Sequence, residues 1–495
     1  MADVLLTHSY HLSYDPKQVR KMQPYPPLGT LYAAAILRQR GISVAVFDTM
    51  LKEPSSLFVE ALKEHQPAVV VIYEDDFNFL TKMCLTRMRQ VAFEMIEASR
   101  AYGARVVVHG SDATDQAPLY LQAGAEFVLQ GESEIRLGDL VASMLLGRTP
   151  TEVPGLAWHD TSGAVMHHAS PVEQANWMQL STPARDLIDL KPYREAWCEA
   201  HGFWSLNIVA SRGCPYRCNW CAKPISGDRF HLRPARLVAQ ELCELRTRFG
   251  ADHAWFGDDV FALDHRWAAE LADEVERIGV RVPFKVQSRA DLMTVSTVDA
   301  LRRAGCAEVW MGVESGSQKV LDAMEKGLKV EAVSRARKML GEAGIQACYF
   351  LQLGYPGELW DEIQQTIALV RRTRPDDIGV SVSYPLPNTR FYEQVRDQLG
   401  AKRNWRDSDD LCVTFTAAYK NEFYLALRDA LHAEVDSWSA KPNPTKSVAE
   451  LWQRVYELEP NSRNVRPTEL PDASIGKGRY APLISADDLR IAREV

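Results

Sequence analysis

The chain has 495 residues, of which 46% are hydrophobic, 25% charged and 9% aromatic. These values exclude disordered, collagen-like and fibrous classes, and the length predicts about two to four domains. The net charge of −8 argues against a nucleic-acid-binding protein that depends on an overall positive field.

The amino terminus lacks the charged segment and long apolar run of a signal peptide. No stretch approaches about 18 apolar residues, so no membrane span is expected. The nine cysteines are an odd number in a long chain, which argues against a disulfide scaffold. We therefore expect a cytoplasmic protein whose thiols are available for metal or redox chemistry.

Residues 1–147 alternate short apolar runs with helical patterns. Strands are predicted at 3–9, 43–48, 68–73, 105–110 and 126–131, and helices at 28–41, 55–65, 83–102, 115–123 and 133–147. This alternation predicts an α/β fold with a doubly wound parallel sheet, of the Rossmann or flavodoxin type. Ligands of such sheets bind beyond the carboxyl ends of the strands, and no G-x-G-x-x-G motif supports a dinucleotide.

The rest of the chain divides into three parts. Residues 148–200 are rich in proline and predict a linker with a small hairpin. Residues 201–399 repeat the strand–helix alternation six times, which predicts a partial (β/α)6 barrel of the TIM type with its chemistry at the carboxyl ends of the strands. Residues 400–495 predict a small helical cap and a tail, and the segment from Asn404 to Tyr424 is the expected cover of the site.

The predicted barrel strands lie at 206–213, 253–259, 283–289, 308–315, 347–354 and 377–384. The intervening helices are predicted at 235–249, 266–278, 295–304, 317–341 and 359–373, with a further helix at 389–398.

The segment SRGCPYRCNWC (211–221) directly follows the first predicted barrel strand and is the strongest chemical signal. Cys214, Cys218 and Cys221 can bind three corners of an iron–sulfur cube and leave the fourth iron open to a small molecule. A zinc site is the alternative, but structural zinc normally takes four ligands and no second close pair of cysteines completes the set. Four basic residues flank the loop and are expected to lower the thiol pKa values: Arg212, Arg217, Lys223 and Arg229.

With an aromatic residue directly before the third cysteine, this motif resembles that of radical S-adenosylmethionine (SAM) enzymes. The resemblance implies a 4Fe-4S cluster whose open iron chelates SAM and whose electron cleaves it to a 5′-deoxyadenosyl radical. It also implies a SAM site at the ends of the barrel strands, made of Trp220, Asp258, Asp259, Ser288, Arg289, Glu314 and Gly354.

Within that implied site, Asp258 and Asp259 would hold the amino group of SAM. Ser288 and Arg289 would contact its ribose or carboxylate. Glu314 would bind ribose hydroxyls or pair with Arg289, and the turn at Gly354 would approach the adenine. Exposed turns and a surface arginine are the alternatives at these positions.

A Rossmann-like domain before such a barrel resembles the cobalamin-binding subclass of radical SAM enzymes. The matching segments are PPLGTLYAAAILRQRG (26–41), VVHGSDAT (107–114) and LQGESE (129–134). The resemblance implies a cobalamin site made of Pro27, Leu28, Gly29, Glu74, Asp75, Asn78, Gly110, Ser111, Gly131 and Glu132. Another ligand, or a purely structural domain, is the alternative.

The D-x-H-x-x-G motif that supplies a cobalt-binding histidine in many cobalamin enzymes is absent from the sequence. We therefore expect that no histidine coordinates cobalt. His8 and His11 lie in the first loop without that spacing and are expected to be solvated.

Together these features predict a methyltransferase that methylates an unactivated carbon through methylcobalamin and a substrate radical. The alternative is a radical cyclase or rearrangement enzyme like the anaerobic magnesium-protoporphyrin monomethyl ester cyclase, which residues 386–411 also resemble. A third possibility is a cobalamin-binding sensory module with an inactive barrel. The expected partners are a small-molecule or natural-product substrate and an electron donor such as flavodoxin or ferredoxin, with no nucleic acid.

Overall fold

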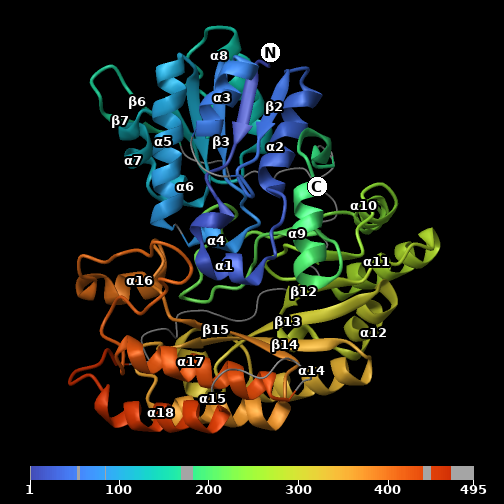
Figure 1. Ribbon diagram of the computed structural model, residues 1–495, viewed down its shortest axis with the longest axis vertical. Coiled ribbons are helices and arrows are strands. Elements are labelled where there is room, and N and C mark those ends of the chain that lie inside the picture. The colour runs from blue at the N-terminus through green and yellow to red at the C-terminus, as the bar shows by residue number, and fades with distance from the viewer. Residues whose placement is uncertain (1, 53–55, 84, 169–181, 439–446, 470–495) are drawn as a thin grey trace.

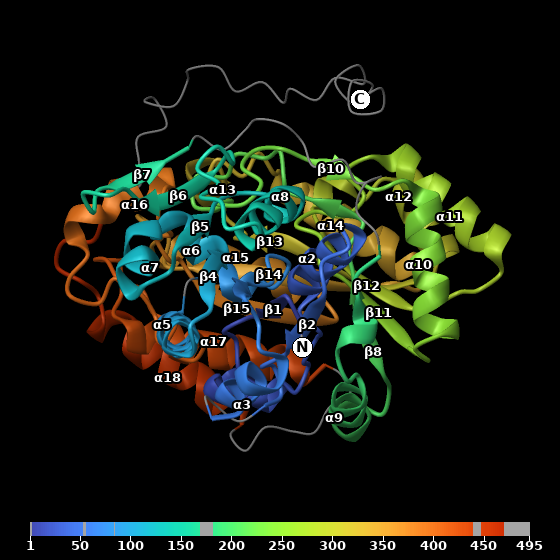
Figure 2. The same ribbon diagram turned by 90° about the horizontal axis from the view of Figure 1, so that it is seen from above.

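The computed structural model describes residues 2–52, 56–83, 85–168, 182–438 and 447–469. Two large sheets dominate it, one in the upper half and one in the lower half of Figure 1. We call the seven-stranded amino-terminal sheet sheet A and the six-stranded sheet of the barrel sheet B. Figure 2, a view from above, shows the amino-terminal domain lying over the barrel.

Sheet A has the strand order β2-β1-β3-β4-β5-β6-β7. Its first five strands are parallel, in the 2-1-3-4-5 order of flavodoxin-like folds, so the predicted doubly wound domain is confirmed. They are β1 (Val4–Thr7), β2 (Val44–Phe47), β3 (Val69–Tyr73), β4 (Arg105–His109) and β5 (Phe127–Leu129).

The hairpin predicted after this domain is present, but it belongs to sheet A. Its strands β6 (Leu156–His159) and β7 (Val165–His167) extend the sheet in antiparallel fashion from β5. The helix α9 (Lys191–His201) follows later in the same segment.

Helices cover both faces of sheet A, because its parallel strands are apolar on both sides. On one face, α2 (Leu28–Gln39) and α8 (Glu134–Leu145) pack against Leu6 and Val71. On the other, α3 (Ser56–His65), α5 (Thr86–Tyr102) and α7 (Ala117–Ala123) pack against Leu5 and Val70. Short helices precede three of these elements: α1 (Pro16–Lys21), α4 (Phe79–Lys82) and α6 (Ser111–Asp115).

Sheet B is entirely parallel, and its strands lie side by side in the order in which they occur in the chain. They are β8 (Ser205–Ile208), β11 (His253–Phe256), β12 (Phe284–Ser288), β13 (Cys306–Glu314), β14 (Gln346–Leu353) and β15 (Asp377–Val382). The predicted partial barrel of six units is thereby confirmed.

Helices connect the strands of sheet B and cover its outer face. They are α10 (Ala235–Thr247), α11 (His265–Ile278), α12 (Val295–Ala304), α13 (Gln318–Ala323), α14 (Val330–Glu342) and α15 (Trp360–Thr373). A single helix was predicted over 317–341, and this is wrong. The backbone takes positive φ at Glu325 and Gly327, so the chain turns there and forms two helices.

The carboxyl-terminal elements are α16 (Arg390–Val395), α17 (Asn421–Asp436) and α18 (Val448–Asn461). Helix α17 packs against β15 and α18. Between α16 and α17, the chain reaches the amino-terminal domain, where the Trp405 carbonyl accepts a hydrogen bond from the Thr86 amide and the Ser408 hydroxyl donates to Asp15. Within the described residues, no helix combines the length and apolar character needed to cross a membrane.

Candidate functional site

A cleft lies between the two domains, where the carboxyl edge of sheet A faces the segment with the three cysteines. It holds about 390 Å³ of empty space, part of it open to solvent. The amino-terminal domain contributes Asp76, Phe77 and Lys82 from the region after β3. The barrel contributes the ends of its first strands and the cysteine loop: Ser211, Arg212, Lys223, Pro224, Ile225, Ser226, Gly257 and Asp259.

The three cysteines lie in a loop that leaves β9 (Ser211–Arg212) and returns as β10 (His231–Leu232), an antiparallel pair of short strands. Burial and the nearby Asp259 raise the pKa of Cys214 to about 11. Burial and the charges of Cys218 and Cys214 raise the pKa of Cys221 to about 12. The thiols are therefore close enough to repel one another as thiolates.

The expectation that flanking basic residues lower these pKa values is wrong for Cys214 and Cys221, because burial outweighs the nearby cations, which also have other partners. Arg212 is paired with Glu134, and Arg217 with Asp228. The Lys223 ammonium donates to the carbonyls of Cys214 and Tyr216. Lys223 offsets only part of the effect of burial at Cys214.

The donor chemistry of the loop fits an iron–sulfur cluster. Soft thiolates are the ligands of such clusters, and metal binding deprotonates a thiol whatever its pKa in the free protein. Among the described residues, no group of three or more His, Cys, Asp and Glu side chains is already arranged around a common metal position. The loop thus supplies the ligand types and spacing for a cluster, and the thiols must turn inward to bind it.

Asp258 and Asp259 end β11 but have different partners. Asp258 is 2% exposed and accepts hydrogen bonds from the Ala210 amide (3.0 Å) and the Ser211 hydroxyl (2.5 Å). Burial raises its pKa to about 7. Asp259 lines the cleft, where it forms an ion pair with Lys82. Asp258 therefore fixes the strand that enters the cysteine loop, whereas Asp259 is the carboxylate presented to a ligand.

The next strand end, that of β12, also contacts the cysteine loop, through Arg289. The Ser288 hydroxyl donates to the Phe261 carbonyl at 2.8 Å. The Arg289 guanidinium pairs with Asp291 and lies 3.8 Å from the centre of the Tyr216 ring, which belongs to the cysteine loop. Arg289 is thus held beside the expected cluster.

Glu314 pairs with Lys326 at 2.8 Å, so the expected alternative of an Arg289 partner is wrong. Lys326 lies 6.0 Å from the centre of the Trp220 ring. The buried indole nitrogen of Trp220 has no hydrogen-bond partner among the described residues. This donor, beside the third cysteine, is available to a ligand.

Gly354, at the end of β14, has φ +77 and donates its amide to Glu358 at 2.6 Å. A Cβ atom at this position would lie 3.0 Å from the Tyr424 ring. On the Cβ side of Gly354, the space where adenine was expected is therefore taken by the Tyr424 side chain of α17.

In the amino-terminal domain, the predicted residues meet at the start of α2 and the loop after β3. The Gly29 amide donates to Asp75 at 3.0 Å, and a Cβ atom on Gly29 would lie 3.2 Å from the Asp76 nitrogen. Gly110 packs directly against Glu74, whose carboxylate accepts a hydrogen bond from the Ser9 amide. Pro27 precedes α2, Leu28 packs against Phe77 and Val209 of the barrel, and Asn78 caps α4.

Several buried acceptors along this edge have no hydrogen-bond partner among the described residues. They are Oε2 of Glu74, Oδ1 of Asp76, the Ser111 hydroxyl and both carboxylate oxygens of Glu132. Each of these residues is less than 9% exposed. Because buried polar groups are normally paired, the carboxyl edge of sheet A is ready to accept hydrogen bonds from a ligand.

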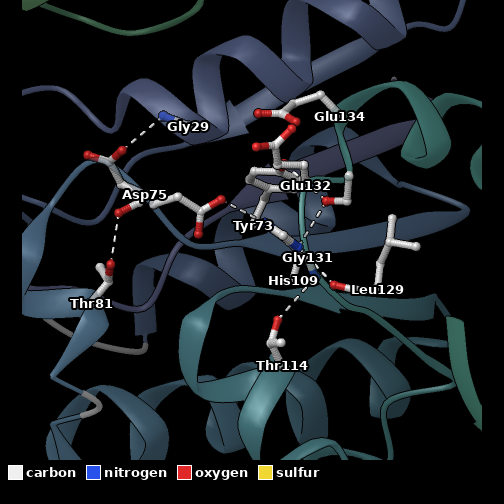
Figure 3. A network of polar contacts seen from close by, with 12 residues as sticks. Gly29, Tyr73, Asp75, Thr81, His109, Thr114, Leu129, Gly131, Glu132 and Glu134 are labelled. Carbon is white, nitrogen blue, oxygen red and sulfur yellow. Dashed lines mark hydrogen bonds and ion pairs between the residues drawn. The ribbon is translucent and has the colours of Figure 1, made fainter. Parts of the chain in front are cut away.

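A network of polar contacts connects the strand ends and loops at this edge (Figure 3). His109 lies between Asp76 (2.8 Å) and the Leu129 carbonyl (2.8 Å), and Tyr73 packs on its ring. The Gly131 amide donates to Thr114. The network fixes the loops after β3 and β5 in place.

Neither histidine of the first loop is solvated, so that expectation is wrong. His8 is 1% exposed and bonds to Asp48 at 2.9 Å, and Asp48 also accepts a hydrogen bond from Tyr193. His11 is buried, and its ring contacts the Lys52 carbonyl.

A buried ion pair between the domains was not predicted from the sequence. Arg212, two residues before Cys214, forms a two-pronged ion pair with Glu134 at the start of α8. Both side chains are less than 5% exposed, and the Arg212 guanidinium also covers the Phe77 ring at 4.9 Å. Arg212 lowers the pKa of Glu134 to about 2 despite its burial. Arg212 belongs to the segment SRGCPYRCNWC and Glu134 to the segment LQGESE, but no sequence pattern indicates that the two form an ion pair.

Comparison with known proteins agrees with this geometry. Residues 208–370 match the radical SAM superfamily. An uncharacterized methyltransferase of Pyrococcus horikoshii is 24% identical over 77% of this chain and 81% of its own length. The hopanoid C-3 methylase of Methylococcus capsulatus is 24% identical over 85% and 79%. The anaerobic magnesium-protoporphyrin IX monomethyl ester cyclase of Cereibacter sphaeroides is 23% identical over 76% and 61%.

Solved structures share the whole two-domain arrangement. The radical SAM methyltransferase TsrM of Kitasatospora setae, with cobalamin and a [4Fe-4S] cluster bound, superposes with a TM-score of 0.67 at 20% identity, over 82% of this chain and 76% of TsrM. The cobalamin-dependent radical enzyme OxsB superposes with a TM-score of 0.71 at 16% identity, over 92% of this chain and 71% of OxsB. The radical SAM resemblance found in the sequence is confirmed for residues 208–370, and the fold of the chain agrees with it.

Proposed function

We propose that this radical SAM enzyme is a cobalamin-dependent methyltransferase that acts at a carbon atom of a small molecule. The observation that carries the proposal is the cleft, in which residues of the cysteine loop lie opposite Asp76, one of the buried acceptors at the carboxyl edge of sheet A. Methyltransferases among the relatives, and the fold shared with TsrM and OxsB, support it.

The acceptors without a hydrogen-bond partner fit a corrin; one of them, Glu132, also lies 3.8 Å from His231. The rim of cobalamin carries several carboxamide groups, whose N–H donors match buried carboxylate and hydroxyl oxygens. Glu74, Asp76, Ser111 and Glu132 supply such oxygens at the ends of three neighbouring strands, β3, β4 and β5. Gly29 leaves room for the loop after β3 to lie against α2, so this edge stays compact beneath the ligand.

On the barrel side, Cys214, Cys218 and Cys221 would bind the cluster, and Asp259 would bind the ammonium of SAM. Asp258, Arg289 and the Glu314–Lys326 pair hold the surrounding backbone and rings in place. When bound, the cluster supplies the electron that cleaves SAM and the corrin carries the methyl group. The protein binds and orients these groups across one cleft.

The test is an anaerobic reconstitution with iron, sulfide and hydroxocobalamin, followed by methyl-labelled SAM and a strong reductant. We expect a bound corrin, 5′-deoxyadenosine and labelled methylcobalamin. The Cys218→Ala variant is the matched control, which should keep the corrin and lose both the cluster absorbance and 5′-deoxyadenosine. A protein with an intact cluster that retains no corrin would refute the cobalamin assignment.

A cyclase or rearrangement enzyme is the second candidate, favoured by the similarity to the anaerobic cyclase of Cereibacter sphaeroides. The same experiment separates the two. Formation of 5′-deoxyadenosine by a protein whose bound corrin never takes up label would favour cyclisation or rearrangement over methyl transfer.

A further inference from the structure

Lys82 is the last residue of α4 and crosses the cleft from the amino-terminal domain to the barrel. Its ammonium pairs with the carboxylate of Asp259, and the two side chains are 23% and 31% exposed. The same ammonium is close enough to Cys221 to stabilise its thiolate. The Lys82 ammonium therefore lies between Cys221 and the carboxylate of Asp259.

This is the position that the ammonium of SAM requires. An amino group chelated to the open iron must lie beside the cysteine loop, and a carboxylate facing it is the expected partner. Asp258 is not available for this role, because the Ala210 amide and the Ser211 hydroxyl already occupy its two oxygens. One carboxylate, that of Asp259, thus faces two ammonium groups.

Lys82 also has a second anion within reach. Asp76 lines the same cleft, and its charge acts on Lys82. One carboxylate oxygen of Asp76 bonds to His109, and the other is buried without a hydrogen-bond partner among the described residues. When the Lys82 ammonium moves away from Asp259, it can therefore form an ion pair with Asp76, which keeps its charge neutralised.

We propose that Lys82 is an internal competitor for the ammonium of SAM, which pairs with Asp259 in the absence of SAM and moves to Asp76 when SAM binds. This inference rests on the SAM site proposed above, but not on the corrin. Since Asp76 belongs to the carboxyl edge of sheet A, the movement links the SAM site to the ligand site of the other domain. Such a link acts equally in both directions.

The test is the affinity of SAM for the full-length, cluster-reconstituted protein without corrin, measured anaerobically by titration calorimetry. Lys82→Met should bind SAM about fivefold more tightly than the wild type, because a partly exposed ion pair no longer has to be broken. Lys82→Arg keeps the competing charge and should stay within about twofold of the wild type. Lys63→Met, on the exposed surface of α3, is the control for loss of a lysine.

A double-mutant cycle completes the test. Asp259→Asn should weaken SAM binding and remove the difference between lysine and methionine at position 82. Iron and sulfide contents and thermal unfolding of each variant establish that the cluster and the fold are intact.

Weaker SAM binding by Lys82→Met would overturn the proposal, since Lys82 would then be a contact of SAM itself. Unchanged binding would overturn it as well. Absence of SAM binding in a wild-type protein with a full cluster would instead contradict the SAM site on which the inference rests. Loss of corrin binding alone would contradict the cobalamin proposal and leave this inference standing.

Discussion

Two adjacent carboxylates, Asp258 and Asp259, show how neighbouring residues in the sequence can have different surroundings, one buried against the backbone and one in the cleft. The sequence predicted that both face the SAM ammonium, because both end the same strand. The structure turns Asp258 into the protein, where it binds the backbone before the cysteine loop, and leaves Asp259 in the cleft. Sequence can place a carboxylate at a strand end, but the side to which it points depends on packing that no local pattern encodes.

The buried Asp258 gives a pH-dependent prediction. Its pKa is raised from 3.8 to about 7 in the folded protein, so the folded state retains a proton that the unfolded state releases. Its contribution to stability is therefore present at low pH and lost as the pH rises from about 4 to 7. In urea unfolding of the apoprotein, the wild type should lose stability relative to Asp258→Asn between pH 5 and pH 8. Parallel pH profiles of the two proteins would contradict the assignment.

At the scale of elements, the sequence predicted strands more reliably than the turns between helices. Continuous apolar runs such as β3 mark buried strands of a parallel sheet, and all eleven predicted parallel strands are present. The prediction failed at 317–341, where a single predicted helix is two helices in the structure, α13 and α14. Such breaks depend on single residues, such as the positive φ at Glu325, which periodicity does not reveal.

The start of α2 gives a prediction at this scale. Because a Cβ atom on Gly29 would lie 3.2–3.3 Å from backbone atoms of residues 74–76, Gly29→Ala should push the loop after β3 away from α2. We expect a cost of about 1–3 kcal/mol in the free energy of unfolding and weaker binding of hydroxocobalamin. Gly400→Ala is the matched control, since no atom lies within 4 Å of its Cβ position. Equal corrin affinities for the two variants would argue against a corrin on this edge.

At the scale of the whole molecule, a buried ion pair joins the two domains at the entrance to the cysteine loop. The sequence predicted both domains, but it gave no indication that Glu134 of one would bind Arg212 of the other. The two residues are 78 positions apart, and charged pairs at such separations have no periodic signature. The arrangement of the domains, and with it the cleft, follows from such contacts.

Loss of one partner should be costly. Glu134→Gln removes the two-pronged charged partner of the buried Arg212 guanidinium, so we expect a loss of about 3–5 kcal/mol in unfolding free energy at pH 7. Because the pKa of Glu134 is lowered from 4.5 to about 2, the pair stabilises the wild type above pH 4.5 and the difference should shrink as the pH falls toward 2.

The half-exposed pair of Arg105 and Glu126 provides the control, and Glu126→Gln should cost less than about 1 kcal/mol. The combined variant Glu134→Gln/Arg212→Met should recover part of the lost stability, because it also removes the buried guanidinium charge. Equal losses for Glu134→Gln and Glu126→Gln in chemical denaturation would show that the interdomain pair contributes no more than a surface pair.

Sheet B has two free edges, β8 and β15, which are not hydrogen-bonded to each other in the described residues. A closed barrel can widen only by breaking backbone hydrogen bonds between strands. Here no backbone hydrogen bonds join the first and last strands within the described residues, so the seam between them can change its width without breaking such bonds. Proteins with this fold can therefore adapt to bulkier or smaller reactants through substitutions of the residues that lie in the seam. The strands that carry the cysteine loop and Asp259 keep their register during such changes.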